Sequence, residues 1–220
     1  MMKEMKAMCN NKVPKFKQRV IFICEGQEDK GYIDKLISLN VWNSEIYDFK
    51  AVNAKSASRI VSKYDSIVSN ESSSSVVLIF CDTDKTPHKE YLNLKKKLQN
   101  IYGGDSAFNR IVIFANPCTM RIVLAHFSEK AKLKTQSKSQ NARLIEKLTN
   151  VNNYKAAKKQ IRSICQKITK ENYYQMKKEL LNESNKSYDI TGSTNFIKFL
   201  EHFESDDPSW INEINKGLNY

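Results

Sequence analysis

Three carboxylates follow apolar segments of the sequence. Glu25 comes directly after the run 19–24, and Asp82 and Asp84 come after the run 76–81. Both runs are rich in Val and Ile, which is typical of strands that are buried on both faces of a parallel sheet. Ligands of such sheets bind outside the carboxyl ends of the strands, so we expect the three carboxylates to meet at one edge. Crowded carboxylates repel each other unless a cation neutralises them, and hard oxygen ligands favour Mg²⁺ or Mn²⁺.

A metal ion at this edge would suit phosphodiester hydrolysis. Asp82 and Asp84 would hold one or two divalent ions, which stabilise charge on a phosphoryl oxygen and lower the pKa of a bound water. The alternative is structural, because carboxylates at strand ends often cap helices and form turns. The pair Asp-Thr-Asp has little specificity without the apolar strand before it.

Strand and helix patterns alternate around these residues. Strands are predicted at 19–24, 46–52, 76–81 and 110–115, with helical patterns between them. This alternation indicates βαβ units with right-handed crossovers. The predicted fold class is α/β, a parallel sheet flanked by helices and followed by an all-helical C-terminal region.

The composition changes near residue 130, after which strand patterns vanish. Helices are predicted there at 141–148, 154–168, 172–181, 195–203 and 208–218. We therefore divide the chain into a basic N-terminal tail, an α/β domain and a basic helical region, which span 1–18, 19–129 and 130–220.

The charge balance favours a polyanionic partner. The 220 residues include 36 Lys and Arg against 24 Asp and Glu, a formal charge of +12, which suggests nucleic acid before a membrane surface. An AT-biased genome would also enrich lysine. Five scattered cysteines argue for reduced thiols in a cytoplasmic protein and against a zinc site. No signal peptide or membrane-spanning run is apparent, so we expect a soluble intracellular protein.

Basic residues near two of these elements could contact phosphates. Lys155, Lys158, Lys159 and Arg162 lie along one predicted helix, with aromatic residues beyond it. Interleaved basic and aromatic residues suit phosphate contacts and base stacking. Lys85 follows the Asp pair and could meet a phosphate. The structural alternatives are that the basic helix face is simply solvated and that Lys85 is an ordinary exposed lysine.

Two features resemble the Toprim domain of topoisomerases, primases and OLD-type nucleases: Glu25-Gly26 after the first strand, and Asp82-x-Asp84 after a later one. By this resemblance, Glu25 shares metal binding or acts as a general acid or base. A parallel α/β fold is also implied.

Two longer segments resemble the RloB-like proteins, a Toprim-related group of bacterial restriction and abortive-infection loci. The segment 25–32, EGQEDKGY, is similar to their EGxTExxYF-like opening. The segment 116–127, which contains Asn-Pro-Cys and ends in His-Phe, resembles their NPCFExWLLLHF-like segment. The likeness covers about the first 130 residues. Asp29, Met120 and Ile122 depart from it, since the family usually has Glu, Glu and Trp at these positions.

This resemblance implies a nuclease that acts in anti-phage defence by abortive infection. Its partner would be RNA or DNA, and a second protein from the same locus is a further candidate. His126 would belong to the active site and Asn116 would contact substrate, although a core histidine and a turn residue are the structural alternatives. A second hypothesis is a non-catalytic binding module for nucleic acid or a protein partner on a degenerate Toprim scaffold, which Met120 favours. A nucleotide-binding signalling protein is a third, but no Gly-rich phosphate loop supports it.

Overall fold

The computed structural model describes residues 16–71, 74–127, 137–181 and 187–218. Their framework is a four-stranded sheet in the order β2-β1-β3-β4, in which all three strand pairs are parallel. The strands are β1 (Gln18–Cys24), β2 (Tyr47–Asn53), β3 (Ser75–Asp82) and β4 (Val112–Ala115). The predicted parallel α/β fold is confirmed. Most of the predicted N-terminal tail, residues 1–15, lies outside the described part.

The two central strands bring their carboxyl ends into line. Cys24 at the end of β1 is paired with Asn53 on β2 and with Phe80 on β3. Both strands are buried over most of their length, which is why their sequences are continuously apolar rather than alternating. The residues that follow β1 and β3 therefore emerge side by side.

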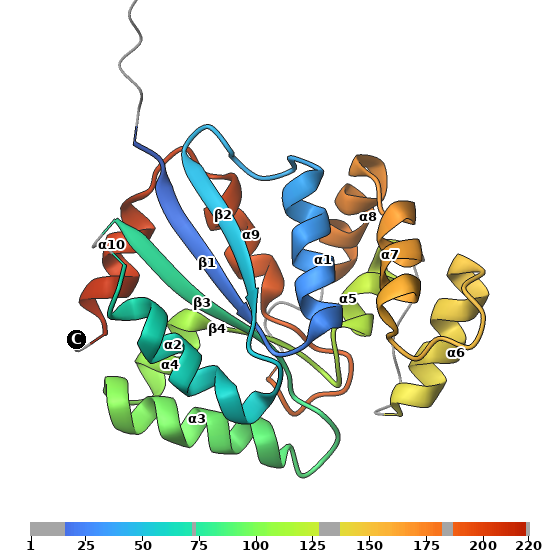
Figure 1. Cartoon of the computed structure of the whole chain (residues 1–220), viewed down its shortest axis with the longest axis horizontal. Coiled ribbons are helices and arrows are strands. Elements are labelled where there is room, and N and C mark those ends of the chain that lie inside the picture. The colour runs from blue at the N-terminus through green and yellow to red at the C-terminus, as the bar shows by residue number, and fades with distance from the viewer. Residues whose placement is uncertain (1–15, 72–73, 128–136, 182–186, 219–220) are drawn as a thin grey trace, which may run out of the picture.

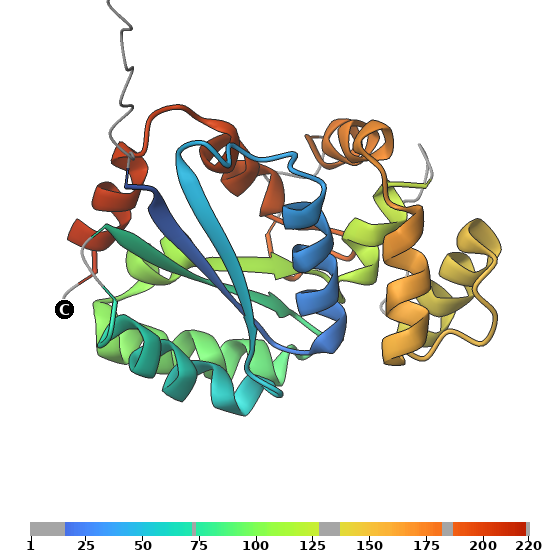
Figure 2. The same cartoon turned by 45° about the horizontal axis from the view of Figure 1, so that its top comes forward.

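Helices cover both faces of the sheet (Figures 1 and 2). On one face lie α2 (Ile60–Val68), which a short 3-10 turn η1 (Ala57–Arg59) precedes, α3 (Lys89–Tyr102) and α4 (Asp105–Ile111). On the other lie α1 (Gln27–Ser38) and α9 (Phe196–Glu204). Tyr32, Ile33 and Leu36 form the buried stripe of α1, and Ile37 packs against the core while partly exposed.

The fourth strand is shorter than predicted. Arg110 and Ile111 belong to α4, and β4 begins only at Val112. Gly103 ends α3 in a left-handed conformation, but the chain starts a new helix at Asp105 instead of a loop. Ala107, Phe108 and Ile111 are buried there, and this i, i+4 burial offsets the β-branched character of the segment.

The remaining helices form two groups. One comprises α5 (Met120–Ala125), α6 (Lys138–Thr149), α7 (Lys158–Lys167) and α8 (Lys170–Leu181), and it lies beyond α1 in Figure 1. The chain then returns to the sheet with α9 and α10 (Ser209–Lys216), which contact β4 and β3.

An aromatic cluster joins these last helices to the sheet. The ring of Phe22 on β1 lies 5.6 Å from Trp42 and 5.3 Å from Phe203 of α9, and Phe203 lies 6.0 Å from Trp210 of α10. Such contacts bury large apolar surfaces in preferred tilted and edge-on geometries. The C-terminal region predicted as a helical unit of its own thus shares one hydrophobic core with the α/β part.

Side chains complete the outer edge of β4. Asn195 accepts a hydrogen bond from Phe114 N and donates one to Val112 O, both at 2.8 Å. Thr194 Oγ1 donates to Phe114 O at 2.5 Å. The edge strand therefore satisfies these backbone groups without a fifth strand, which protects it from pairing with another chain.

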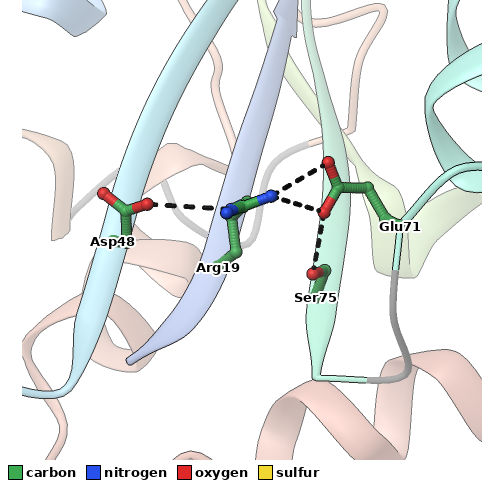
Figure 3. Close-up of polar contacts among 4 residues, drawn as sticks. All are labelled: Arg19, Asp48, Glu71 and Ser75. Atoms are coloured by element: carbon green, nitrogen blue, oxygen red, sulfur yellow. Dashed lines mark hydrogen bonds and ion pairs between the residues drawn. The ribbon is translucent and has the colours of Figure 1, made fainter. Parts of the chain in front are cut away.

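Charged groups join the strands at their amino ends, far along the sheet from the carboxylates. Figure 3 shows Arg19 of β1 between Asp48 of β2 and Glu71, which also accepts a hydrogen bond from Ser75 of β3. The Arg19 contacts are 3.7 Å to Asp48 and 3.0 Å to Glu71. Arg19 and Asp48 are largely exposed, and such pairs contribute on the order of 0–1 kcal/mol.

The cysteines of the described residues, Cys24, Cys81, Cys118 and Cys165, form no disulfide. Among the same residues, no helix has the length and apolar character needed to cross a bilayer.

Candidate metal centre

Backbone pairing places Glu25 and Asp82 next to each other. Glu25 continues the β1 ladder, since its N–H donates to Phe80 O at 3.1 Å. Its carboxylate turns toward β3, where Oε2 accepts a hydrogen bond from Asp82 N at 3.3 Å. The predicted meeting of these two residues at one edge of the sheet follows directly from the parallel register.

The turn after β3 is fixed to the end of β4. Thr83 N donates to Ala115 O and Asp84 N to Pro117 O, both at 3.0 Å. Asp84 and His88 have positive φ angles of 57° and 56°, a left-handed conformation that is uncommon for residues other than glycine. The His88 ring holds this turn together, because Nδ1 lies 2.9 Å from Asp84 O. This loop conformation brings the first helical turn of α3 next to the carboxylates.

Three carboxylates converge as a result: Glu25, Asp84 and Glu90. Each offers one oxygen, and these oxygens all lie within 4.8 Å of one another. Opposite ligands of an octahedral Mg²⁺ at about 2.1 Å are about 4.2 Å apart, so a small side-chain adjustment would let the three share one ion. The donor set fits Mg²⁺ or Mn²⁺, which prefer carboxylate oxygen.

Glu90 was missing from the predicted site. It lies on the exposed first turn of α3, where an acidic residue is also expected simply because it complements the helix dipole. Only its place six residues after Asp84 hints at a shared site. The two left-handed residues that fold it back could not be recognised from their types.

Asp82 lies at the predicted edge, but its carboxylate has a hydrogen-bond partner on another segment. Its Oδ1 accepts a hydrogen bond from Thr119 N at 2.9 Å, at the start of α5, and it does not belong to the converging three. Asp82 therefore joins the end of β3 to α5 and lies beside Glu25, whose carboxylate binds its backbone. The structure thus offers Glu25, Asp84 and Glu90 as a candidate ligand set, and the predicted role of Asp82 as a ligand stays a prediction.

Asp29 forms a second, buried layer of acid behind this edge. Its carboxyl accepts hydrogen bonds from Gly26 N at 2.8 Å and from Thr119 Oγ1 at 2.5 Å. The pKa of Asp29 is raised to about 7: burial is the main cause, nearby Glu28 and Glu25 add to the rise, and the hydrogen bonds from Thr119 and Gly26 oppose it. Thr119 therefore links the Asp29 and Asp82 carboxylates.

His126 lies in the helix core. Its Nε2 is 2.9 Å from Tyr32 Oη and its Nδ1 is 3.2 Å from Asn172 Oδ1. Because Asn172 Nδ2 donates to Lys167 O, its Oδ1 is the acceptor. His126 thus carries its proton on Nδ1 and accepts from Tyr32. Burial lowers the pKa of His126 to about 4. These contacts are those of a structural histidine, and its predicted catalytic role stays a prediction.

The other predicted contacts near the edge differ in exposure. Asn116 is fully buried, its Nδ2 donates to Tyr188 O at 2.7 Å, and its Oδ1 has no partner among the described residues. Lys85 is exposed directly after Asp84. Met120 is 6% exposed at the start of α5, so an uncharged side chain suits its surroundings.

A cationic cleft lies between α1 and α7. It has a volume of about 570 Å³, and its lining includes Lys30, Lys35, Lys158 and Arg162. Its lining includes Gln27, which follows the end of β1, and Asn53, the last residue of β2. Lys158 and Arg162 were predicted to contact phosphates, and the fold places both in this cleft. Lys155 and Lys159 are exposed nearby but do not line it.

The approach of α7 to α1 depends on Gly31. A Cβ built at this position would lie 2.7 Å from Ile161 Cγ2, which is too close for unbonded carbon atoms. Cys165 Sγ also contacts Gly31 O, at 3.4 Å. The close approach of α7 to α1 along the cationic cleft thus requires a glycine at position 31.

No protein-family model, curated protein or solved structure matches this chain.

Proposed function

We propose that this protein is a metal-dependent nuclease of Toprim-like, RloB-like type that hydrolyses phosphodiester bonds of RNA or DNA. The observation that carries the proposal is the convergence of Glu25, Asp84 and Glu90 at the carboxyl edge of a parallel sheet, where ligands of such sheets bind. The motif resemblance supports it. Anti-phage defence in the cytoplasm is the setting that the resemblance adds.

Glu25, Asp84 and Glu90 would hold Mg²⁺ or Mn²⁺. When bound, the ion supplies charge stabilisation at a phosphoryl oxygen and a more acidic water. Glu25, whose backbone is fixed to β3, would also handle protons. Asp82 would orient Glu25, because its N–H donates to Oε2. Asp29 and Thr119 support this arrangement from the buried side.

The cationic cleft supports the choice of substrate. In the lining of the cleft, Lys30 forms an ion pair with Asp34. Lys35, Lys158 and Arg162 therefore give the lining a net positive charge. Phosphate contacts of this kind position a polyanion without reading its sequence. The part of the cleft at Gln27 would direct a bound backbone toward the carboxylates.

The deciding experiment compares cleavage of mixed RNA and DNA substrates by the parent, Glu25→Ala, Asp84→Ala and Glu90→Ala. Glu45→Ala, which removes an exposed carboxylate elsewhere, is the matched control. We expect Mg²⁺- or Mn²⁺-dependent cleavage that falls about 100-fold or more in the three site variants and is unchanged in the control. Titration with Mn²⁺, followed by its electron paramagnetic resonance signal, should show weaker binding in the same three variants. Equal cleavage by parent and Asp84→Ala would refute the site.

A salt series tests the nucleic-acid contact separately. Counterion release should make affinity fall steeply with added salt, and Lys158→Glu with Arg162→Glu should reduce that dependence by about one unit of logarithmic slope or more. If the affinity of the parent for nucleic acid does not change with salt, binding through charge is excluded.

A non-catalytic binding module is the second candidate. The observation that favours it is the use of the Asp82 carboxylate to cap α5 through Thr119 N, a structural task. Salt-dependent binding without any metal-dependent cleavage in the parent would select this function over the nuclease.

A further inference from the structure

A second, larger groove runs along the outer edge of β4. It has a volume of about 1120 Å³ and lies between α3 and α4 on one side and α9 and α10 on the other. Asn195, which completes the edge of β4, forms part of its lining. Ligand pockets usually have about 300–1,000 Å³, so this groove suits a length of chain better than a single small molecule.

The groove begins beside the carboxylate edge. The first turn of α3 presents Glu90 to the converging carboxylates, and the next residue, Tyr91, lines the groove. Tyr188, also in the lining, has its ring 5.8 Å from that of His88. His88 in turn contacts Asp84 O at 2.9 Å. A ligand in the groove would thus lie next to the Glu25, Asp84 and Glu90 group.

Aromatic side chains lie along the groove. The Tyr91 and Tyr188 rings are 5.0 Å apart near the carboxylates, and farther along His202 is stacked on Trp210 with centroids 5.0 Å apart at 15°. Tyr188 and His202 are partly exposed. Their exposed parts could contact unpaired bases, and stacking of bases on aromatic rings tolerates any base.

The charges of the groove complement a polyanion. The lining contains three cations, the exposed Lys198 and Lys216 together with Arg110, and one acid, Glu213, so its net charge is positive. Arg110 is held in place, because Nη1 donates to Glu213 O at 3.2 Å and lies where a side chain at position 217 would collide with it. This hydrogen bond keeps the Arg110 guanidinium beside α10, in the lining of the groove.

We propose that the groove binds a single-stranded segment of nucleic acid and leads it to the carboxylates. The cationic cleft lies on the β2 side of the carboxylate edge and the groove on the β4 side, so one strand could run from one to the other across the edge. This delivery role rests on the proposed nuclease function. Binding by the groove itself does not. Duplexes keep their bases stacked inside and would gain only the phosphate contacts.

The test measures fluorescence anisotropy of labelled oligonucleotides of about 12 nucleotides, as single-stranded RNA, single-stranded DNA and the DNA duplex, in EDTA so that none is cleaved. The groove variant carries Lys198→Glu and Lys216→Glu. The control carries Lys63→Glu and Lys97→Glu, exposed lysines of α2 and α3 outside the groove, which change the net charge equally. Circular dichroism checks the fold of both.

We expect single strands to bind tighter than the duplex, and the groove variant to bind them about tenfold or more weakly than the control. The slope of affinity against salt should fall by about 1.4 in the groove variant, for two lost contacts to a single strand. Equal binding by groove and control variants, or equal affinity for duplex and single strand, would overturn the proposal. The RNA and DNA arms identify the preferred strand.

Asp84→Ala separates this proposal from the nuclease function. In EDTA it should bind single strands at least as tightly as the parent, because it removes a negative charge beside the bound strand, whatever it does to cleavage. If the groove variant loses binding and the parent does not cleave, the groove proposal is supported and the nuclease function is rejected. If the parent cleaves and the groove variant binds as tightly as the control, the nuclease function is supported and the groove proposal is rejected.

Discussion

The buried histidine predicts a specific loss of stability in acid. His126 has a pKa of about 4 in the folded protein against an ordinary value of 6.5. Between these values the unfolded chain binds a proton that the folded chain does not, so the free energy of unfolding decreases as the pH falls from 6.5 toward 4. Each pKa unit corresponds to about 1.4 kcal/mol, so the loss should approach about 3 kcal/mol at pH 4. Above pH 6.5 His126 should have no such effect.

The comparison with His126→Gln isolates this contribution. A glutamine can still accept from Tyr32 and donate to Asn172, but it does not titrate. Asp29 has a raised pKa and opposes the trend, since its protonation as the pH falls removes a destabilising buried charge. That effect is common to both proteins and cancels in their difference.

The assay is urea unfolding at a series of pH values from 8 to about 4. Above pH 6.5 we expect the free energies of unfolding of parent and variant to differ by a constant amount. Near pH 4 the parent should have lost about 3 kcal/mol more than the variant. Parallel curves over the whole range would show that His126 is protonated in the folded state without penalty, and would refute the burial argument.

Three further substitutions test the residues around the site. Gly31→Ala should gain about 1 kcal/mol in helix propensity but lose about 1–3 kcal/mol by overpacking against the stiff Ile161 side chain; we expect net destabilisation in urea unfolding, reversed if Ile161→Ala is added. Thr119→Val should lower the free energy of unfolding at pH 8 by about 2 kcal/mol, because the ionised Asp29 carboxylate loses its donor; an unchanged unfolding midpoint would contradict this. Met120→Glu should not be needed for metal-dependent cleavage, and activity that appears only in this variant would show that the natural chain has lost its catalysis.

The sequence by itself determined the framework. Continuous apolar runs such as the one before Glu25 can only be satisfied by burial on both faces, and their alternation with helical patterns leaves few topologies besides a parallel sheet. The same reasoning placed Glu25 and Asp84 at one edge, because the carboxyl ends of parallel strands coincide. The stripe of α1 is equally local, since its period appears within one helix.

The tertiary structure decided what depends on contacts between distant segments. Glu90 joins the carboxylates because left-handed residues at Asp84 and His88 fold α3 back, and no residue type there requires that conformation. Asp82 turns to Thr119, which lies 37 positions away along the chain. The helices α9 and α10 return to the sheet for the same reason: the apolar face of a helix shows that it is buried, but not against which partner.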